Sequence, residues 1–189
     1  RTPFVAMRNV IAIDLSGNRI QSVDADWFLT TARLENVNLE RNRISSIAGG
    51  AFADVRSLKE LRLGSNHLTN VDGGLFANLT RLESLDLGFN PLRRLPTADA
   101  TFVGLTSLRR LNLSATCLTE FYFRSAAAST LPALEELELR GNGLRSVTAA
   151  SLAGVASSLR RLDLGDNDIG ALEPAALASL VNLVSLNLT

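Results

Sequence analysis

The sequence predicts an α/β solenoid: a right-handed, curved coil with a parallel β-sheet on its concave face and short helical or extended returns on its convex face. The pattern L-x-x-L-x-L-x-x-N-x-L starts eight times, at intervals of 24 to 26 residues. Apolar and polar residues alternate within each pattern, as in a short strand with one buried face. A return of this length is too long for a hairpin, so successive strands are parallel and joined by crossovers.

The pattern starts define the expected strands in order along the chain. They are Val10, Leu34, Leu58, Leu82, Leu108, Leu134, Leu159 and Leu183. No single repeat buries its apolar side alone, so stacked repeats form one continuous core. We therefore expect a single repeat array over residues 1–189, with about seven complete repeats and a partial repeat at each end. The exposed core expected at both ends suggests a fragment of a larger chain.

A second column of apolar residues supports this register on the convex side. Phenylalanines lie six residues before the next start in four repeats, at Phe28, Phe52, Phe76 and Phe102. Repeat five has Ala128 in this slot, and its return carries Tyr122 and Phe123. Either these aromatic residues fill the missing slot, or they form a lateral contact site on an otherwise uniform scaffold.

A column of asparagines follows the strands. Its members are Asn18, Asn42, Asn66, Asn90, Asn142 and Asn167, and Thr116 takes the place of the asparagine in repeat five. An asparagine side chain there is able to bond backbone groups of its own turn and of the neighbouring turn, which a sheet ladder does not reach. We expect a structural asparagine ladder.

These motifs resemble the leucine-rich repeat family, in its 24-residue class of animal extracellular proteins. The resemblance covers Phe4 to Thr189, and it implies a ligand-recognition segment of an extracellular receptor of the Toll-like type. From this resemblance we expect a protein ligand and pairing with a second ectodomain of the same or another kind. The alternatives are a cell-adhesion or guidance protein, a secreted matrix protein and, with less support, a cytosolic scaffold. Membrane-anchored and secreted forms are both open.

Composition gives little support for catalysis or for binding through bulk charge. Lys+Arg and Asp+Glu are both 19, which argues against a nucleic-acid binder that works through net charge. No apolar run approaches the roughly 20 residues that a membrane-spanning helix needs. His67 and Cys117 are the one histidine and the one cysteine. With two strand spacings, about 10 Å, between them, they do not form a nucleophile–base pair. We expect neither an enzyme, nor a metal site, nor a cofactor.

The solvent-facing positions of the strands form columns of polar residues. One column alternates in sign from Glu35 to Arg160, and we expect cross-strand pairs along it. The central column is mostly acidic, and Glu138 and Asp163 are neighbours in it. Either a basic ligand or a bound cation relieves this repulsion, or Arg140 and Arg161 do. The candidate ligand-binding residues are Asp86, Phe89, Glu138, Arg140, Asp163 and Asp166.

Three N-x-[ST] sequons mark candidate glycosylation sites of an exported protein. They begin at Asn78, Asn112 and Asn187. The repeat itself favours such strings, so chance matches are expected. Asn112 is predicted to face the concave side, where a glycan would block a binding surface.

Overall fold

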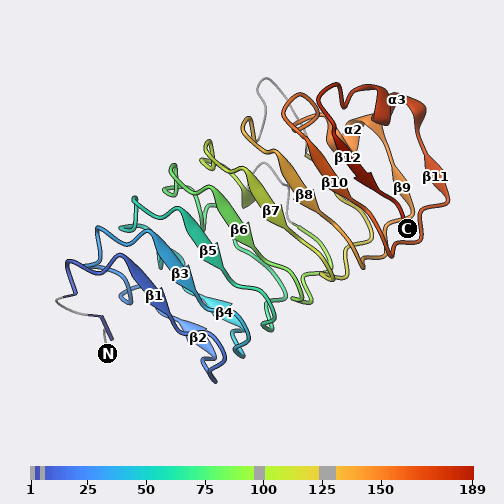
Figure 1. The fold of residues 1–189 in the computed structure, drawn as a ribbon. Coiled ribbons are helices and arrows are strands. Elements are labelled where there is room, and N and C mark those ends of the chain that lie inside the picture. The colour runs from blue at the N-terminus through green and yellow to red at the C-terminus, as the bar shows by residue number, and fades with distance from the viewer. Residues whose placement is uncertain (1–2, 5–6, 96–100, 124–130) are drawn as a thin grey trace.

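A parallel eight-stranded sheet forms one face of the molecule (Figure 1). The computed structural model describes residues 3–4, 7–95, 101–123 and 131–189. The strands of this sheet, in spatial order, are β1 (Ala12–Asp14), β3 (Asn36–Asn38), β5 (Glu60–Arg62), β6 (Ser84–Asp86), β7 (Arg110–Asn112), β8 (Glu136–Glu138), β10 (Arg161–Asp163) and β12 (Ser185–Asn187). Each strand contributes one turn of a solenoid, as the repeat predicts.

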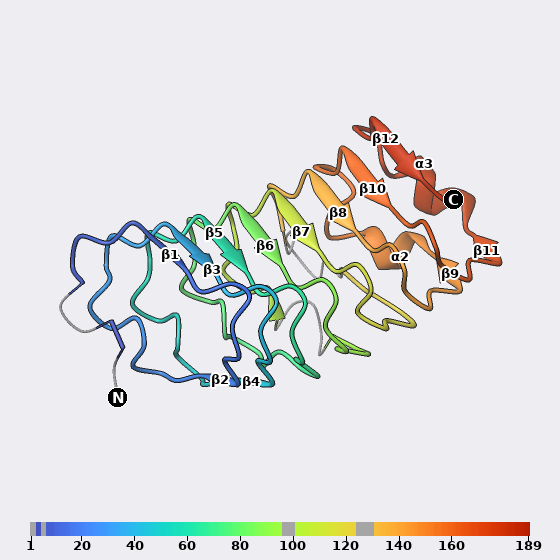
Figure 2. The same ribbon diagram turned by 60° about the horizontal axis from the view of Figure 1, so that its bottom comes forward.

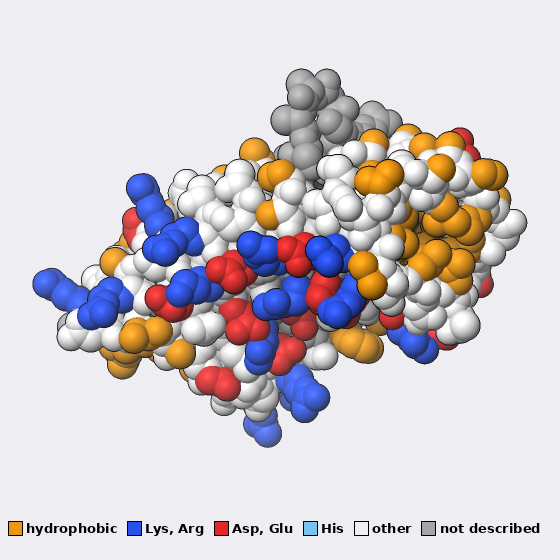
Figure 3. All heavy atoms as spheres, turned by 45° about the horizontal axis from the view of Figure 1, so that its top comes forward, with side chains coloured by type: hydrophobic (Ala, Val, Ile, Leu, Met, Phe, Trp, Pro, Cys, Tyr) orange, Lys and Arg blue, Asp and Glu red, His pale blue; other side chains and the backbone are white. Residues whose placement is uncertain are grey.

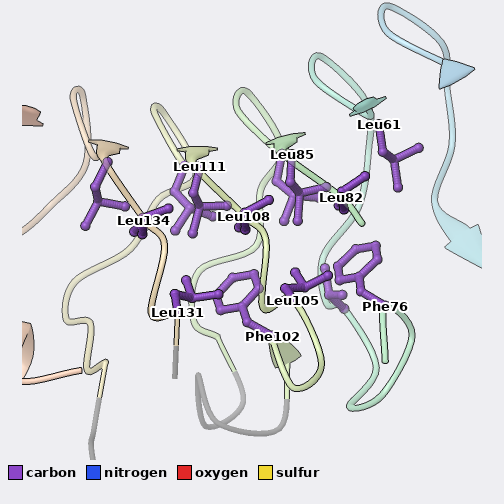
Figure 4. Packing of buried hydrophobic residues seen from close by; sticks show 14 of the residues in the cluster. Leu61, Phe76, Leu82, Leu85, Phe102, Leu105, Leu108, Leu111, Leu131 and Leu134 are labelled. Atoms are coloured by element: carbon purple, nitrogen blue, oxygen red, sulfur yellow. The ribbon is translucent and has the colours of Figure 1, made fainter. Parts of the chain in front are cut away.

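The strand register is the one that the repeat spacing predicts. The central residue of each strand is apolar and aligns with the central residue of the next, as in Leu61 with Leu85 and Leu85 with Leu111. These side chains point away from the concave face into a core shared by all repeats, where they face Phe76 and Phe102 (Figure 4). The predicted solenoid, with its parallel concave sheet, is confirmed.

The outer layer is mostly extended, with two short pieces of sheet and two short helices in the described residues (Figure 2). The small sheets pair β2 (Ser22–Val23) with β4 (Ser46–Ile47), and β9 (Ser146–Val147) with β11 (Ala171–Leu172). The helices are α2 (Ala149–Leu152) and α3 (Pro174–Ala178). Thr148 caps α2, because its hydroxyl accepts the Ser151 N–H at 3.2 Å.

The phenylalanine column packs behind the sheet. Phe28 and Phe52 stack with ring centroids 5.8 Å apart, and Phe52 stacks on Phe76 at 6.3 Å. Phe123 is fully buried and stacks on Phe102 at 6.1 Å. It therefore fills the slot that Ala128 leaves in the pattern. The expectation of a lateral contact through Phe123 is wrong, because no part of this ring reaches solvent. Ala128 itself lies outside the described residues.

The asparagine ladder joins neighbouring turns. The Asn66 amide donates to the Leu39 and Leu63 carbonyls, at 2.9 Å each, and its Oδ1 accepts the Ile44 N–H at 2.9 Å. The other described ladder residues make corresponding bonds; Asn18, at the first turn, bonds only within its own turn. These bonds satisfy turn groups that the sheet cannot reach.

Thr116 interrupts the ladder at repeat five. Its hydroxyl donates to the Leu113 carbonyl at 2.7 Å, and its N–H donates to Asn142 Oδ1 at 3.0 Å. It has no amide with which to reach the preceding turn. The Leu92 N–H therefore bonds the Asn90 carbonyl of its own turn, at 2.8 Å.

Each turn places the residue before the ladder position in the left-handed region. These residues are Gly17, Arg41, Ser65, Phe89, Ala115, Gly141 and Asp166, with φ between 51° and 69°. Glycine adopts this conformation without cost, whereas a bulky side chain adopts it rarely. Phe89, with φ of 55°, is the bulkiest of the apolar residues in this set.

Apolar side chains are exposed at both ends of the described solenoid. Ile11 and Met7 are exposed at the first turn, and Val181 and Val184 are 76% and 74% exposed at the last. Within the described ranges, no helix has the length and apolar character needed to cross a bilayer.

Candidate functional site

The concave sheet brings Asp86, Glu138 and Asp163 into one column. The register places Asp86 beside Asn112, Asn112 beside Glu138, and Glu138 beside Asp163. Asp86 and Glu138 are thus two strand spacings apart, about 10 Å, and Glu138 and Asp163 are one spacing apart. Acidic and basic side chains interleave in a band over this part of the molecule (Figure 3).

Most members of this column also hold the strand-exit turn. Asp86 Oδ1 accepts the Gly88 N–H at 2.8 Å, and Asp163 Oδ1 accepts the Gly165 N–H at 2.9 Å. The same bond to the residue two positions on is made by Asp14, Asn38, Asn112 and Asn187. Aspartate and asparagine side chains have the length for this turn. The structural role of Asp86 and Asp163 was missed in the sequence.

Glu138 is the acidic residue of the column that does not hold a turn in this way. In the described part of the chain it forms no ion pair, because both arginines proposed to relieve it pair elsewhere. Arg140 binds Asp166 at 2.6 Å, and Arg161 binds Glu136 at 2.5 Å. The expected relief of Glu138 by these two arginines is therefore wrong.

The surroundings of Glu138 disfavour its charged form. Partial desolvation within the concave face raises the pKa of Glu138, and the carboxylates of Asp86, Asp163 and Glu136 raise it further. Its side chain still reaches solvent, so a ligand has access to it. Glu138 is thus an accessible carboxylate with unfavourable local electrostatics.

Arg62 balances the acids at the other end of the column. It binds Glu60 at 2.7 Å, and the pKa of Arg62 is raised chiefly by that contact, with further contributions from Glu40 and Asp86. The acidic character of the column is therefore greatest from Glu138 to Asp163.

The alternating column forms separate ion pairs rather than a continuous ladder. Lys59 binds Glu35 at 2.8 Å, and Arg109 binds Glu135. Glu83 and Arg160 make no ion pair with the rest of the described residues. Each paired side chain contacts one of its two oppositely charged neighbours, so the alternating charges form isolated ion pairs.

The strand-exit edge carries the other candidates. Phe89 is 63% exposed, and its N–H donates to the Ser114 carbonyl of the next turn at 2.8 Å. Asp166 occupies the same turn position in a later repeat and binds Arg140 there. The structure thus separates the predicted residues into a concave column and an edge.

Two shallow depressions flank Glu138 on the concave face. One, of about 170 Å³, extends from Arg62 and Asp86 across Asn112 to Glu138. The other, of about 160 Å³, extends from Glu138 across Asp163 to Asn187. Glu136 and Glu138 line both. These depressions have the size of side chains, which suits contact with a macromolecular surface.

The remaining candidates lie apart from this column. Tyr122 is 42% exposed and donates to Glu120 at 3.4 Å. His67 and Cys117 are exposed on different turns. In the described residues, no group of three or more His, Cys, Asp or Glu side chains is placed to hold a metal ion.

Comparison with known proteins identifies the repeat. The family model for the leucine rich repeat matches residues 32–92, 56–118 and 132–189, more than half of the chain. The chain belongs to the leucine-rich repeat family. No curated protein gave a match.

Solved structures with this solenoid include Toll-like receptor ectodomains, which the chain resembles. A TLR13–ssRNA13 complex matches with a TM-score of 0.86, 28% identity and 94% of this chain covered. The Drosophila Toll–Spatzle complex (93% of this chain) and the mouse RP105/MD-1 complex (92%) each match with a TM-score of 0.78 and 23% identity. The chain spans 24%, 23% and 30% of the lengths of these three structures, so it corresponds to about a quarter of each solenoid-bearing chain.

Proposed function

We propose that this chain is a ligand-recognition segment of an extracellular leucine-rich repeat receptor of the Toll-like type, and that it binds a protein. The main support is Glu138, an accessible carboxylate without an ion-pair partner in the described residues, which lies between two depressions of the concave face. A cationic side chain of a ligand would relieve the repulsion from Asp86 and Asp163. The family membership and the likeness to Toll-like ectodomains agree with this function.

Phe89 supplies the second part of the proposed site. Its exposed ring stands at the strand-exit edge, three residues beyond Asp86. Exposed aromatic rings are frequent anchors of protein interfaces. A ligand that places an apolar group on Phe89 and a basic group near Glu138 would use both features.

The concave acids favour a protein ligand over a nucleic acid. TLR13 is in complex with single-stranded RNA, so balanced net charge does not by itself exclude RNA for a solenoid of this kind. Phosphates would meet Glu138 and Asp163 at the column centre, and that contact is repulsive. Pairing with a second ectodomain is part of the proposal, with Tyr122 as the exposed lateral candidate.

A binding screen with matched variants tests the proposal. The immobilised chain is probed with an array of purified extracellular proteins and with a single-stranded RNA of mixed sequence. We expect a protein whose affinity falls at least tenfold in Glu138→Gln and in Phe89→Gly, and falls with added salt. Leu29→Ser is the control, since Leu29 is 54% exposed on the convex return. Binding only to RNA, or equal affinity in all three variants, contradicts the proposed site.

A further inference from the structure

The three sequons lie in different structural settings, and only one leaves its amide available. The Asn112 and Asn187 side chains accept the N–H two residues on at the ends of concave strands, whereas Asn78 lies on the convex return. We propose that Asn78 is the one N-glycosylated asparagine of the folded chain, while Asn112 and Asn187 remain unmodified. The proposal rests on the extracellular location proposed above.

Asn78 is presented at the tip of a turn between two buried anchors. Phe76 and Leu79 are fully buried, and the Leu79 N–H donates to the Phe76 carbonyl at 2.9 Å. Asn78 and Thr80 are both exposed between and beside these anchors. No hydrogen bond holds the Asn78 side chain within the described residues, so its amide nitrogen faces solvent in a fixed turn.

The neighbouring repeats carry no buried side chain at the position of Asn78. The residue two positions after the phenylalanine is Asp54 in the preceding repeat and Gly104 in the following one. Asp54 is exposed, and Gly104 carries no side chain. The following repeat does contact this turn, since Gly104 packs against the Ala77 carbonyl and Ser107 Oγ donates to the Thr80 carbonyl at 2.7 Å. These contacts leave the Asn78 side chain exposed.

Asn112 is engaged in the concave face. Its Oδ1 accepts the Ser114 N–H at 2.8 Å, so the sequon itself is folded into a turn. A Cβ atom built on Gly88 would lie only 2.9 Å from Asn112 Nδ2. The nitrogen that would carry the sugar is therefore packed against the backbone of the preceding repeat.

Asn187 is engaged in the same way. Its Oδ1 accepts the Thr189 N–H at 3.1 Å and the Thr189 hydroxyl at 2.8 Å. Its Nδ2 donates to Asp163 Oδ1 at 3.1 Å. A glycan on this nitrogen would break the contact with Asp163 and enter the concave depression.

The modification is a group transfer from a lipid-pyrophosphate-linked oligosaccharide. Nδ2 of Asn78 attacks the anomeric carbon of the first sugar, and a C–N bond forms while the C–O bond to pyrophosphate breaks. The amide loses one proton, and the lipid pyrophosphate leaves with the electron pair of the broken bond. The attached glycan would cover the convex return and leave the concave column open to a ligand.

Site-resolved mass spectrometry tests the assignment. The chain is expressed in animal cells behind a secretion signal, and its intact mass is measured before and after treatment with a peptide N-glycosidase. We expect one glycan, lost completely in Asn78→Gln and in Thr80→Ala, and retained in Thr80→Ser, Asn112→Gln and Asn187→Gln. The cell-associated chain is analysed in the same way if little protein is exported, because transfer takes place inside the secretory pathway.

The outcomes separate this proposal from the proposed function. A chain that enters the secretory pathway without a glycan, or with a glycan that persists in Asn78→Gln, overturns the assignment. Neither result bears on ligand binding through Glu138 and Phe89, which is measured on the unmodified Asn78→Gln chain. Conversely, a glycan on Asn78 in a chain whose binding is insensitive to Glu138 and Phe89 overturns only the recognition site.

Discussion

Phe123 stacks on Phe102 with ring centroids 6.1 Å apart, although it stands five residues before the slot that the repeat reserves for phenylalanine. The backbone supports this insertion, because the Phe123 N–H donates to the Ser151 carbonyl at 2.9 Å and its own carbonyl accepts the Gly154 N–H. Repeat five thus keeps an aromatic ring in the convex core, although the ring comes from an earlier position of the return.

This packing predicts a large loss of stability in Phe123→Ala. Removing a fully buried aromatic ring typically costs about 3–5 kcal/mol. Tyr122→Ala is the matched control and should cost under about 1 kcal/mol, since the Tyr122 side chain is 42% exposed. Urea denaturation followed by circular dichroism measures both. Similar losses for the two variants would contradict the assignment of Phe123 to the core.

The asparagine ladder predicts a second difference in stability. Asn66→Ala leaves the buried Ile44 N–H without its acceptor, at a cost of roughly 1–3 kcal/mol. It also removes one donor each from the Leu39 and Leu63 carbonyls, which keep their bonds from Asn42 and Asn90. Asn18 at the exposed first turn bonds only within its own turn, so Asn18→Ala should cost clearly less. Thermal or urea unfolding compares the two. A greater loss in Asn18→Ala would show that the ladder contributes little.

Phe89 predicts an unusual pair of effects. Its left-handed backbone costs an L-residue about 1–2 kcal/mol, and its ring buries little in the isolated chain. Phe89→Gly should therefore be as stable as the natural chain or up to about 1 kcal/mol more stable, after the larger unfolded-state entropy of glycine is taken into account.

Phe89→Ala separates conformation from side-chain contacts, because it removes the ring and keeps the strained backbone. We expect it to be less stable than Phe89→Gly, as measured by urea denaturation. If the alanine variant were the more stable of the two, the left-handed turn would not be strained at this position.

Glu138 predicts a pH-dependent effect. The pKa of Glu138 in the folded chain lies above its ordinary value of 4.5. The group therefore contributes to the free energy of unfolding below pH 4.5, and this contribution is lost as the pH rises through the raised pKa. Glu138→Gln should therefore be more stable than the natural chain at neutral pH, and the difference should vanish on acidification. The measurement is the difference in unfolding free energy between the two chains from pH 3 to pH 8.

Glu135→Gln is the control for this experiment. Glu135 binds Arg109, so its neutralisation removes a favourable exposed pair worth at most about 1 kcal/mol. It should lower stability at neutral pH, opposite in sign to Glu138→Gln. A loss of stability in Glu138→Gln would indicate a partner for Glu138 and would return the column to a structural role.

The regular part of this fold was predictable because one pattern is repeated. The spacing of Leu61, Leu85 and Leu111 predicts both strand register and core, and the period of Asn66 and Asn90 predicts the ladder. The ion-pair partners and the position of the fifth aromatic ring do not follow from the repeat period. Arg109 has Glu83 and Glu135 on either side of it in its column, and side-chain reach decides that it binds Glu135. The displaced Phe123 depends on the path of a return of irregular length.

One structural signal in the sequence was overlooked. Aspartate or asparagine ends the strand at Asp14, Asn38, Asp86, Asn112, Asp163 and Asn187. Their recurrence at one position is the mark of a turn that accepts the N–H two residues on. Recognising it would have singled out Glu138 and Arg62 as the two strand ends that are free of this task.

The interruption of the asparagine ladder at Thr116 affects how the solenoid unfolds locally. On either side of it, ladder amides tie each turn to the next, whereas within the described residues no ladder amide joins the turns of Asn90 and Thr116. These two repeats are held by the sheet, by backbone bonds of the turns such as Arg93 N–H to the Thr116 carbonyl at 2.9 Å, and by the stack of Phe102 on Phe123. Linear repeat arrays unfold in blocks set by the strength of neighbouring interfaces. Amide hydrogen exchange should therefore divide the solenoid into two cooperative blocks that meet near β6 and β7, each with its own opening free energy.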